Sequence, residues 1–207
     1  IDRWILSVLN TLIKGVQKEM ENFDPTRAGR LIEDFVNNDL SNWYVRLNRK
    51  RFWGKEMSQD KLAAYQTLYT CLTTVAKLLA PFAPFFADQL FCDLGAAQLE
   101  GTTSVHLAKF PVADKKLIDR ELEERMGMAQ KITSMVHALR KKVNIAVRQP
   151  LQAIMIPAVD DEQRRHIEAV KDLILSEVNV KELRFVEGSG VLVKKVKCNF
   201  RTMGKKF

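Results

Sequence analysis

The residues best suited to bind another molecule lie in one short stretch, LSNWYVRLNRKRFWGK, at positions 40–55. This stretch holds Trp43, Tyr44 and Trp53 together with five cationic side chains and no acid. The cations are Arg46, Arg49, Lys50, Arg51 and Lys55. Arginine and aromatic rings stack on unpaired bases, and the guanidinium fork also binds phosphate. The stretch therefore predicts either a grip on an anion with flat rings or a helix whose aromatic residues face a core.

The spacing within this stretch separates two helical faces, because residues three and four positions apart share a face. One face carries Asn42, Arg46, Arg49 or Lys50, and Trp53. The other carries Leu40, Trp43, Tyr44 and Leu47. We expect Trp43 and Tyr44 to fill a core. For Trp53, packing against the following turn, stacking on a neighbouring arginine and stacking on a base all remain open.

Catalytic and metal-binding patterns are missing from the sequence. It contains no GxGxxG, GxxxxGK[ST], HExxH or GxSxG motif. The three histidines, His106, His137 and His166, are about thirty residues apart and have no spacing typical of a metal site. The three cysteines form no CxxC pair, which predicts buried thiols in a reducing cytoplasm. We expect the chain itself to perform no chemistry.

The net charge of +8 is unevenly distributed along the chain. Residues 1–100 carry 12 basic and 12 acidic side chains, whereas residues 101–207 carry 21 basic and 13 acidic ones. The last seventeen residues hold six cations and no acid. This gradient predicts a polyanionic partner, with nucleic acid ahead of a membrane surface. No apolar run approaches the roughly 20 residues that span a bilayer. The chain opens with IDRWILSVLN, already in helical register, which suggests a piece of a longer protein.

The first half of the chain has the period of helices. An apolar stripe runs from Trp4 to Val16, and a second helix is expected to start at Pro25, capped by Asp24, and to continue to Gly54. A third helix should begin near Ser58, whose hydroxyl can cap it. Pro81 and Pro84 should break the chain before a fourth helical segment, PFFADQLF. Long helices joined by short turns predict an antiparallel bundle.

The second half changes character twice. Residues from about 95 to 118 have no clear period and predict a connection over the surface, followed by a long helix that ends in Arg140, Lys141 and Lys142. After Asn144 the order strand, helix, strand, strand predicts a small α+β module. We therefore expect a mainly α protein, with a helical bundle at residues 1–142 and a small α+β module at residues 143–207.

Several segments resemble the region that follows the catalytic core of isoleucyl-tRNA synthetases, a class I family. They are DRWILSVLN, DPTRAGRLIEDFVNNDLSNWYVRLNRKRFW, AYQTLYTCLTTVAKLLAPFAPFFAD, SVHLAKFP, LRKKVNIAVRQPL and MGKKF. They cover essentially the whole chain in the expected order. LAPFAPFF alone is less specific, because valyl- and leucyl-tRNA synthetases carry similar segments. NWYVRLNRKRFW followed by VRQPL favours the isoleucine family and its eukaryote-like branch, and the lack of paired cysteines agrees with that branch.

The resemblance implies an anticodon-binding helical bundle with part of the C-terminal extension, non-catalytic by itself, from a cytoplasmic ligase. Such a ligase attaches isoleucine to its tRNA and uses ATP and magnesium in its catalytic portion. The implied partners are an isoleucine tRNA and the catalytic and editing domains of the same parent chain, with no membrane. No cofactor is expected in this segment.

The residues that we expect to contact RNA combine the cationic stretch with cations farther along the chain. They are Arg46, Arg49, Lys50, Arg51, Trp53, Lys55, Arg140, Lys141, Lys142, Arg148, Gln149, Lys194, Lys195 and Lys197. Arg46 could instead pair internally with Asp34, Asp39 or Glu56. The alternatives for function are a basic structural or protein-interaction module, or the equivalent domain of a valyl- or leucyl-tRNA synthetase.

Overall fold

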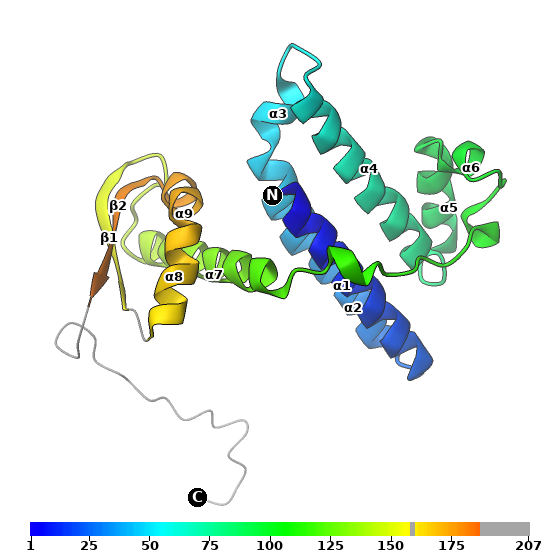
Figure 1. The fold of residues 1–207 in the computed structure, drawn as a ribbon, viewed down its shortest axis with the longest axis horizontal. Helices are drawn as coiled ribbons and strands as arrows, with labels where there is room; N and C mark the ends of the chain where they lie inside the picture. The colour runs from blue at the N-terminus through cyan, green and yellow to red at the C-terminus, as the bar shows by residue number, and fades with distance from the viewer. Residues whose placement is uncertain (158–159, 187–207) are drawn as a thin grey trace, which may run out of the picture. The chain divides into compact units, whose positions relative to one another are not determined.

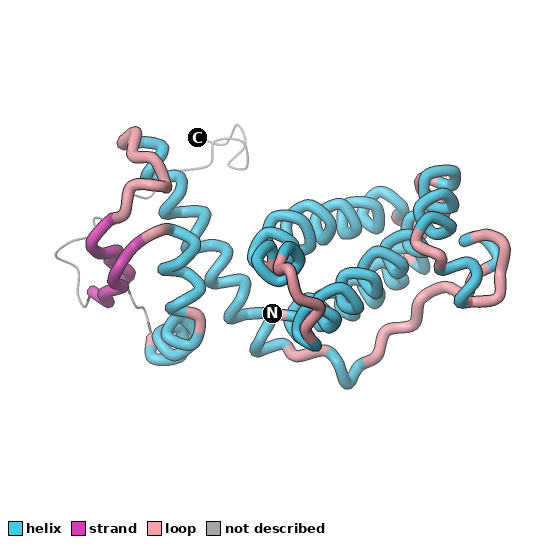
Figure 2. Tube along the Cα trace, turned by 90° about the horizontal axis from the view of Figure 1, so that it is seen from above, coloured by secondary structure: helices cyan, strands magenta, loops and turns pink. Residues whose placement is uncertain are grey.

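The computed structural model describes residues 1–157 and 160–186, and these residues are mainly helical (Figure 1). The chain divides into two compact units, Ile1–Glu123 and a second unit that begins at Glu124. Within the described residues, strands occur only in the second unit (Figure 2). A mainly α protein with a small α+β part, as the sequence predicts, is confirmed.

The first unit is a helical bundle in which α1 packs against α2, η1 and α4 (Figure 1). Its elements are α1 (Asp2–Glu21), α2 (Pro25–Asp34), the π-helix η1 (Phe35–Val45), α3 (Arg49–Trp53), α4 (Gln59–Leu79) and α5 (Pro84–Asp93). The expected stripe on α1 is buried from Trp4 to Val16. Burial of that stripe supplies most of the stability of α1, because helices in proteins are held mainly by packing of an apolar face and only weakly by helix propensity.

The single helix expected from Pro25 to Gly54 is instead three consecutive segments, α2, η1 and α3. Residues 37–42, NNDLSN, are rich in Asn, Asp and Ser, which favour the α-helix weakly because their side chains compete for backbone hydrogen bonds. This composition agrees with a widened helix in η1. Asn48 interrupts the helix before α3, and its buried side-chain amide donates to the Tyr44 carbonyl at 2.9 Å. The expected end at Gly54 is confirmed.

Two helix starts have the caps that the sequence predicts. The Asp24 carboxylate accepts a hydrogen bond from the Arg27 backbone N–H at 3.0 Å, and Pro25 occupies the first position of α2. The Ser58 hydroxyl accepts one from the Lys61 N–H at 3.1 Å. Each cap satisfies a backbone donor that the first turn of a helix leaves without an intrahelical partner.

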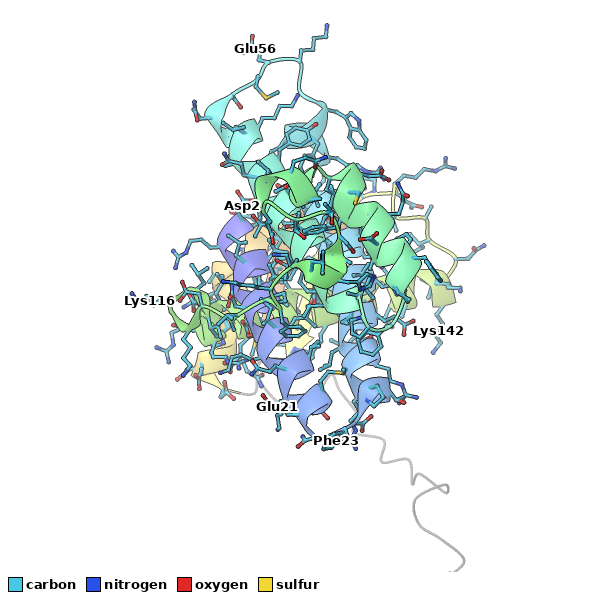
Figure 3. The ribbon with its side chains drawn as sticks, turned by 90° about the vertical axis from the view of Figure 1, so that its right-hand side faces the viewer. Asp2, Glu21, Phe23, Glu56, Lys116 and Lys142 are labelled. Carbon is cyan, nitrogen blue, oxygen red and sulfur yellow. The ribbon has the colours of Figure 1, made fainter. Side chains whose placement is uncertain are left out.

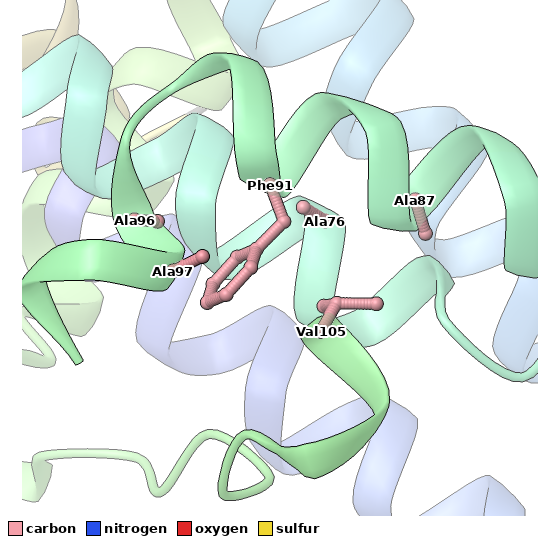
Figure 4. Close-up of a cluster of buried hydrophobic side chains, with 6 residues drawn as sticks. All are labelled: Ala76, Ala87, Phe91, Ala96, Ala97 and Val105. Carbon is pink, nitrogen blue, oxygen red and sulfur yellow. The ribbon is translucent and has the colours of Figure 1, made fainter. Parts of the chain in front are cut away.

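The connection expected over residues 95–118 contains three short helical turns, α6 (Ala96–Leu99), η2 (Val105–Leu107) and η3 (Lys115–Leu117). Phe91 is buried among four alanines and Val105, which join α4, α5, α6 and η2 (Figure 4). Asp88 fixes the same segment by accepting hydrogen bonds from the Ser104 hydroxyl at 2.7 Å and from the Val105 N–H at 2.8 Å. The connection is therefore packed onto the bundle.

The long helix α7 (Arg120–Lys142) belongs to the first unit only through its first turn. There, Glu123 accepts hydrogen bonds from the hydroxyls of Ser7 and Thr11 on α1. The rest of α7 belongs to the second unit, so the division of the chain falls before the predicted boundary at residue 142. Hydrogen bonds from Arg140, described below, explain why the end of α7 goes with that unit.

The second unit places α8 (Asp161–Ala169) and α9 (Lys171–Val178) between β1 (Leu151–Pro157) and β2 (Val180–Val186). The strands pair in parallel, with Leu151 opposite Val180 and Pro157 opposite Val186. Parallel neighbours require a crossover, which the two helices supply. The strand–helix–strand order is therefore confirmed. The last predicted strand, in the segment after Val186, lies outside the described residues.

Candidate nucleic-acid interface

The aromatic residues of the 40–55 stretch divide as their spacing predicts. Trp43 and Tyr44 are buried in the bundle. Trp53, in contrast, is 72% exposed at the end of α3, and the Arg49 guanidinium lies 5.6 Å from the centre of its ring. Of the three alternatives left open for Trp53, stacking with a neighbouring arginine is the one observed. An exposed indole paired with a guanidinium presents a flat cationic surface to solvent.

Arg51 has a different environment from its neighbours. Its guanidinium donates to the carboxylates of Asp2 at 2.8 Å and Asp60 at 2.7 Å, and to the Asn48 side chain at 2.9 Å. These bonds join α3 to the first residues of α1 and α4. Sequence reasoning considered internal ion pairs for Arg46 and missed this one, because Asp2 is 49 residues away from Arg51.

The Arg51 contacts also shift the pKa of the groups around them. Hydrogen bonding to Arg51 lowers the pKa of the Asp2 carboxyl, although burial opposes the effect. The Tyr44 hydroxyl donates to Asp2 at 2.9 Å, and burial followed by this bond raises the pKa of Tyr44 well above its usual value. Asp2 is therefore an anion at neutral pH, held by one guanidinium and one hydroxyl.

The remaining predicted cations of the stretch are exposed: Arg46, Arg49, Lys50 and Lys55. Arg46 donates to the carbonyl of Asn42, one turn earlier, at 2.8 Å. Asn42 is also exposed, in agreement with the face predicted for it. These side chains keep their charges at the surface, where a polyanion can reach them.

A hollow of about 500 Å³ lies between the end of α3 and the start of α4. Four cationic residues line it, Lys50, Arg51, Lys55 and Lys61, together with the acids Glu56 and Asp60. Asp60 is held by Arg51 at 2.7 Å, so the lining keeps an excess of positive charge. The sequence analysis did not include Lys61 in this surface. Its position one turn after the Ser58 cap, close to the cationic stretch, could have indicated it. The Lys61 ammonium group donates to the Gly54 carbonyl at 2.6 Å.

Arg140 is buried, with 2% of its surface exposed. One terminal nitrogen donates to the carbonyls of Ala146 and Gln149, at 3.1 and 3.0 Å. The other donates to the carbonyls of Val178 and Asn179, at 2.9 and 3.1 Å. Through these four hydrogen bonds, the Arg140 guanidinium joins the loop before β1 to the turn before β2. Because it is buried, RNA cannot reach it.

The other predicted residues of the second unit are exposed. They are Lys141, Lys142, Arg148 and Gln149. The Gln149 carbonyl accepts from Arg140, while the residue itself stays exposed to water. Lys194, Lys195 and Lys197 lie outside the described residues.

Among the residues that the structure describes, no group of three or more His, Cys, Asp or Glu side chains is arranged to hold a metal ion. No helix in the described ranges 1–157 and 160–186 is both long and apolar enough to cross a membrane.

Comparison with known proteins decides the family. Residues 2–155 match the family described as the anticodon-binding domain of tRNA ligase. The chain belongs to this family. The match includes the whole 40–55 stretch and the hollow beside it, and it continues through α7 into β1.

Relatives from several bacteria carry the name isoleucine–tRNA ligase. The chain is 68% identical over its whole length to the isoleucine–tRNA ligase of Bacteroides fragilis and 60% identical to that of Porphyromonas gingivalis. Over 94% of its length it is 46% identical to the isoleucine–tRNA ligase of Dehalococcoides mccartyi. The chain spans about a fifth of the length of these relatives, 18–19%.

Proposed function

We propose that this chain is the anticodon-recognition segment of an isoleucine–tRNA ligase and that it binds isoleucine tRNA without catalysing a reaction itself. The match of residues 2–155 to the anticodon-binding family carries the proposal, and the name shared by the relatives specifies the amino acid. Activation of isoleucine with ATP and magnesium, transfer to tRNA and proofreading are then tasks of the remaining length of such a cytoplasmic ligase.

The surface that we propose for phosphate contact consists of the exposed Arg49 together with Lys50 and Lys55, which are exposed and line the hollow. The exposed indole of Trp53, with the Arg49 guanidinium beside it, would accept a base or a ribose face. Lysine and arginine side chains at a surface release counterions when they bind phosphates, so such contacts make affinity fall with salt.

The contacts of the second unit are part of the same proposal. Lys141, Lys142, Arg148 and Gln149 are exposed and remain candidates for RNA contact. We assign Arg51 and Arg140 to the fold instead of to RNA, because carboxylates and carbonyls already occupy their guanidinium groups.

The test is binding of an isoleucine-tRNA transcript by the 207-residue chain across a series of salt concentrations. We expect log affinity to fall linearly with log salt, and we expect the double variant Arg49→Ala/Lys50→Ala to reduce that slope by about one per lost phosphate contact. A matched control, Lys115→Ala/Lys116→Ala, removes the same charge from an exposed adjacent pair in the same unit.

The competing function, a basic module that docks on protein, predicts no tRNA binding at any ionic strength. A transcript with an exchanged anticodon separates anticodon recognition from general attraction to RNA. Equal slopes for the wild type, the Arg49→Ala/Lys50→Ala variant and the control would refute the proposed phosphate surface.

A further inference from the structure

The turn between α1 and α2 holds Phe23 in an unusual backbone conformation. The Phe23 N–H donates to the Met20 carbonyl at 3.0 Å, and the Asp24 N–H donates to the Glu19 carbonyl at 2.9 Å. This pair of bonds is the Schellman ending of a helix, and its left-handed position is usually occupied by glycine. Phe23 occupies that position here, with φ of +57°.

A phenylalanine at this position is unfavourable for the fold in two ways. A bulky residue at positive φ is a true outlier, because its Cβ crowds the backbone, whereas Asn144 and Asn179, also at positive φ, belong to a type that tolerates it. Phe23 is also 94% exposed, so its ring gains almost no packing in return. Backbone strain of this kind is found most often where a residue serves function instead of stability.

The turn itself is firmly built. Asp24 caps α2 through its bond to the Arg27 N–H, and Pro25 fixes the next backbone angle. The Schellman bonds close the other side of the turn. Phe23 therefore lies in a hydrogen-bonded corner at the end of the helical pair, where it is almost fully exposed to solvent (Figure 3). In that view it lies at the opposite end of the first unit from Glu56, which lines the cationic hollow (Figure 3).

Charged side chains of both signs surround the turn. Lys18, Arg27 and Arg30 lie within about two turns of Phe23, and so do the acids Glu19, Glu21 and Asp24. Arg27 lies 3.2 Å from the Asp24 carboxylate and 4.0 Å from that of Glu19, so the local charge is balanced. It is therefore the ring itself that favours a base, because an exposed aromatic ring stacks on the face that every unpaired base has.

We propose that Phe23 is a stacking platform for an unpaired base of the bound RNA, at a site separate from the cationic hollow. This inference rests on the proposed function and deepens it, because it names the α1–α2 turn as an element that contacts a base. It requires an aromatic ring at position 23, not merely an apolar side chain.

The experiment measures two quantities on the 207-residue chain, affinity for an isoleucine-tRNA transcript and the midpoint of thermal unfolding. Phe23→Gly should weaken binding roughly 5- to 150-fold, the usual effect of losing one stacked base. The same substitution should leave the unfolding midpoint unchanged or higher, because glycine relieves the strain at positive φ. If Phe23 served only the fold, the Phe23→Gly substitution would lower the unfolding midpoint instead.

Two further variants identify the chemistry. Phe23→Trp should keep the affinity, whereas Phe23→Leu, which is apolar but has no aromatic face, should lose as much as Phe23→Gly. The control is Phe85→Ala, because Phe85 is also 91% exposed but has the ordinary backbone of α5. It should bind tRNA like the wild type.

The possible failures are distinguishable. Wild-type affinity in Phe23→Gly, or in Phe23→Leu, overturns base stacking at this turn while leaving the proposed function intact. A loss in Phe85→Ala equal to that in Phe23→Gly overturns the assignment to the turn. A wild-type chain that binds no tRNA at low salt overturns the proposed function, and this inference falls with it.

Discussion

Replacing Arg140 by alanine should destabilise the second unit, although the sequence places this residue in a cationic cluster. The guanidinium makes four hydrogen bonds of 2.9–3.1 Å to carbonyls. Hydrogen bonds to charged groups contribute about 1.5–3 kcal/mol each, so a simple sum would exceed about 6 kcal/mol. Once the Arg140 side chain is removed, water can hydrogen-bond to the carbonyls of the exposed Gln149 and the partly exposed Asn179, which recovers part of this free energy. We therefore expect a loss of about 3–5 kcal/mol.

Hydrogen exchange is the appropriate assay, because it reads each unit separately. The Leu151 N–H donates to the Asn179 carbonyl at 3.2 Å, next to two of the Arg140 contacts. Exchange of this amide should accelerate roughly 100-fold or more in Arg140→Ala. All three tryptophans lie in the first unit, so tryptophan fluorescence should report an unchanged unfolding midpoint there.

A matched control lies beside it in the chain. Lys141 is exposed in the same turn of α7, and Lys141→Ala should change the free energy of unfolding by less than about 0.5 kcal/mol. If Arg140→Ala changed the exchange of the Leu151 amide no more than Lys141→Ala does, the structural role derived from these hydrogen bonds would be refuted.

Two further predictions concern groups whose pKa the fold shifts. Arg51 lowers the pKa of Asp2 below its ordinary value of 3.8, so this ion pair stabilises the fold above that pH and loses its effect as pH falls through the lowered value. The difference in urea-unfolding free energy between the wild type and Asp2→Asn should therefore shrink between about pH 7 and pH 3, and a constant difference would contradict this account. Burial raises the pKa of the Cys71 thiol to about 12. At neutral pH, iodoacetamide should label the partly exposed Cys92 in the folded protein and Cys71 only after denaturation, as read by peptide mapping. Equal labelling of both thiols in the folded protein would show that Cys71 is accessible.

Local features of the sequence were sufficient for much of the fold. The apolar stripe of α1, the caps at Asp24 and Ser58, and the burial of Trp43 all follow from spacing or from contacts within a few residues. Helix periodicity decides which side chains share a face, so it also predicted that Trp53 would lie away from Trp43. The sequence could not predict the widening of the helix into η1, since a helical pattern does not specify the register of its hydrogen bonds.

The roles of individual cations depended on tertiary structure. Arg49 and Arg51 are two residues apart in one cationic run, yet one lies exposed over Trp53 and the other is held by Asp2 and Asp60. The partners of Arg140 lie up to 39 residues away in the chain. Charge and spacing establish that a positive surface exists, because they are properties of the chain itself. Which guanidinium groups remain available to a ligand depends on the carboxylates and carbonyls that folding brings beside them, and only the three-dimensional structure contains that information.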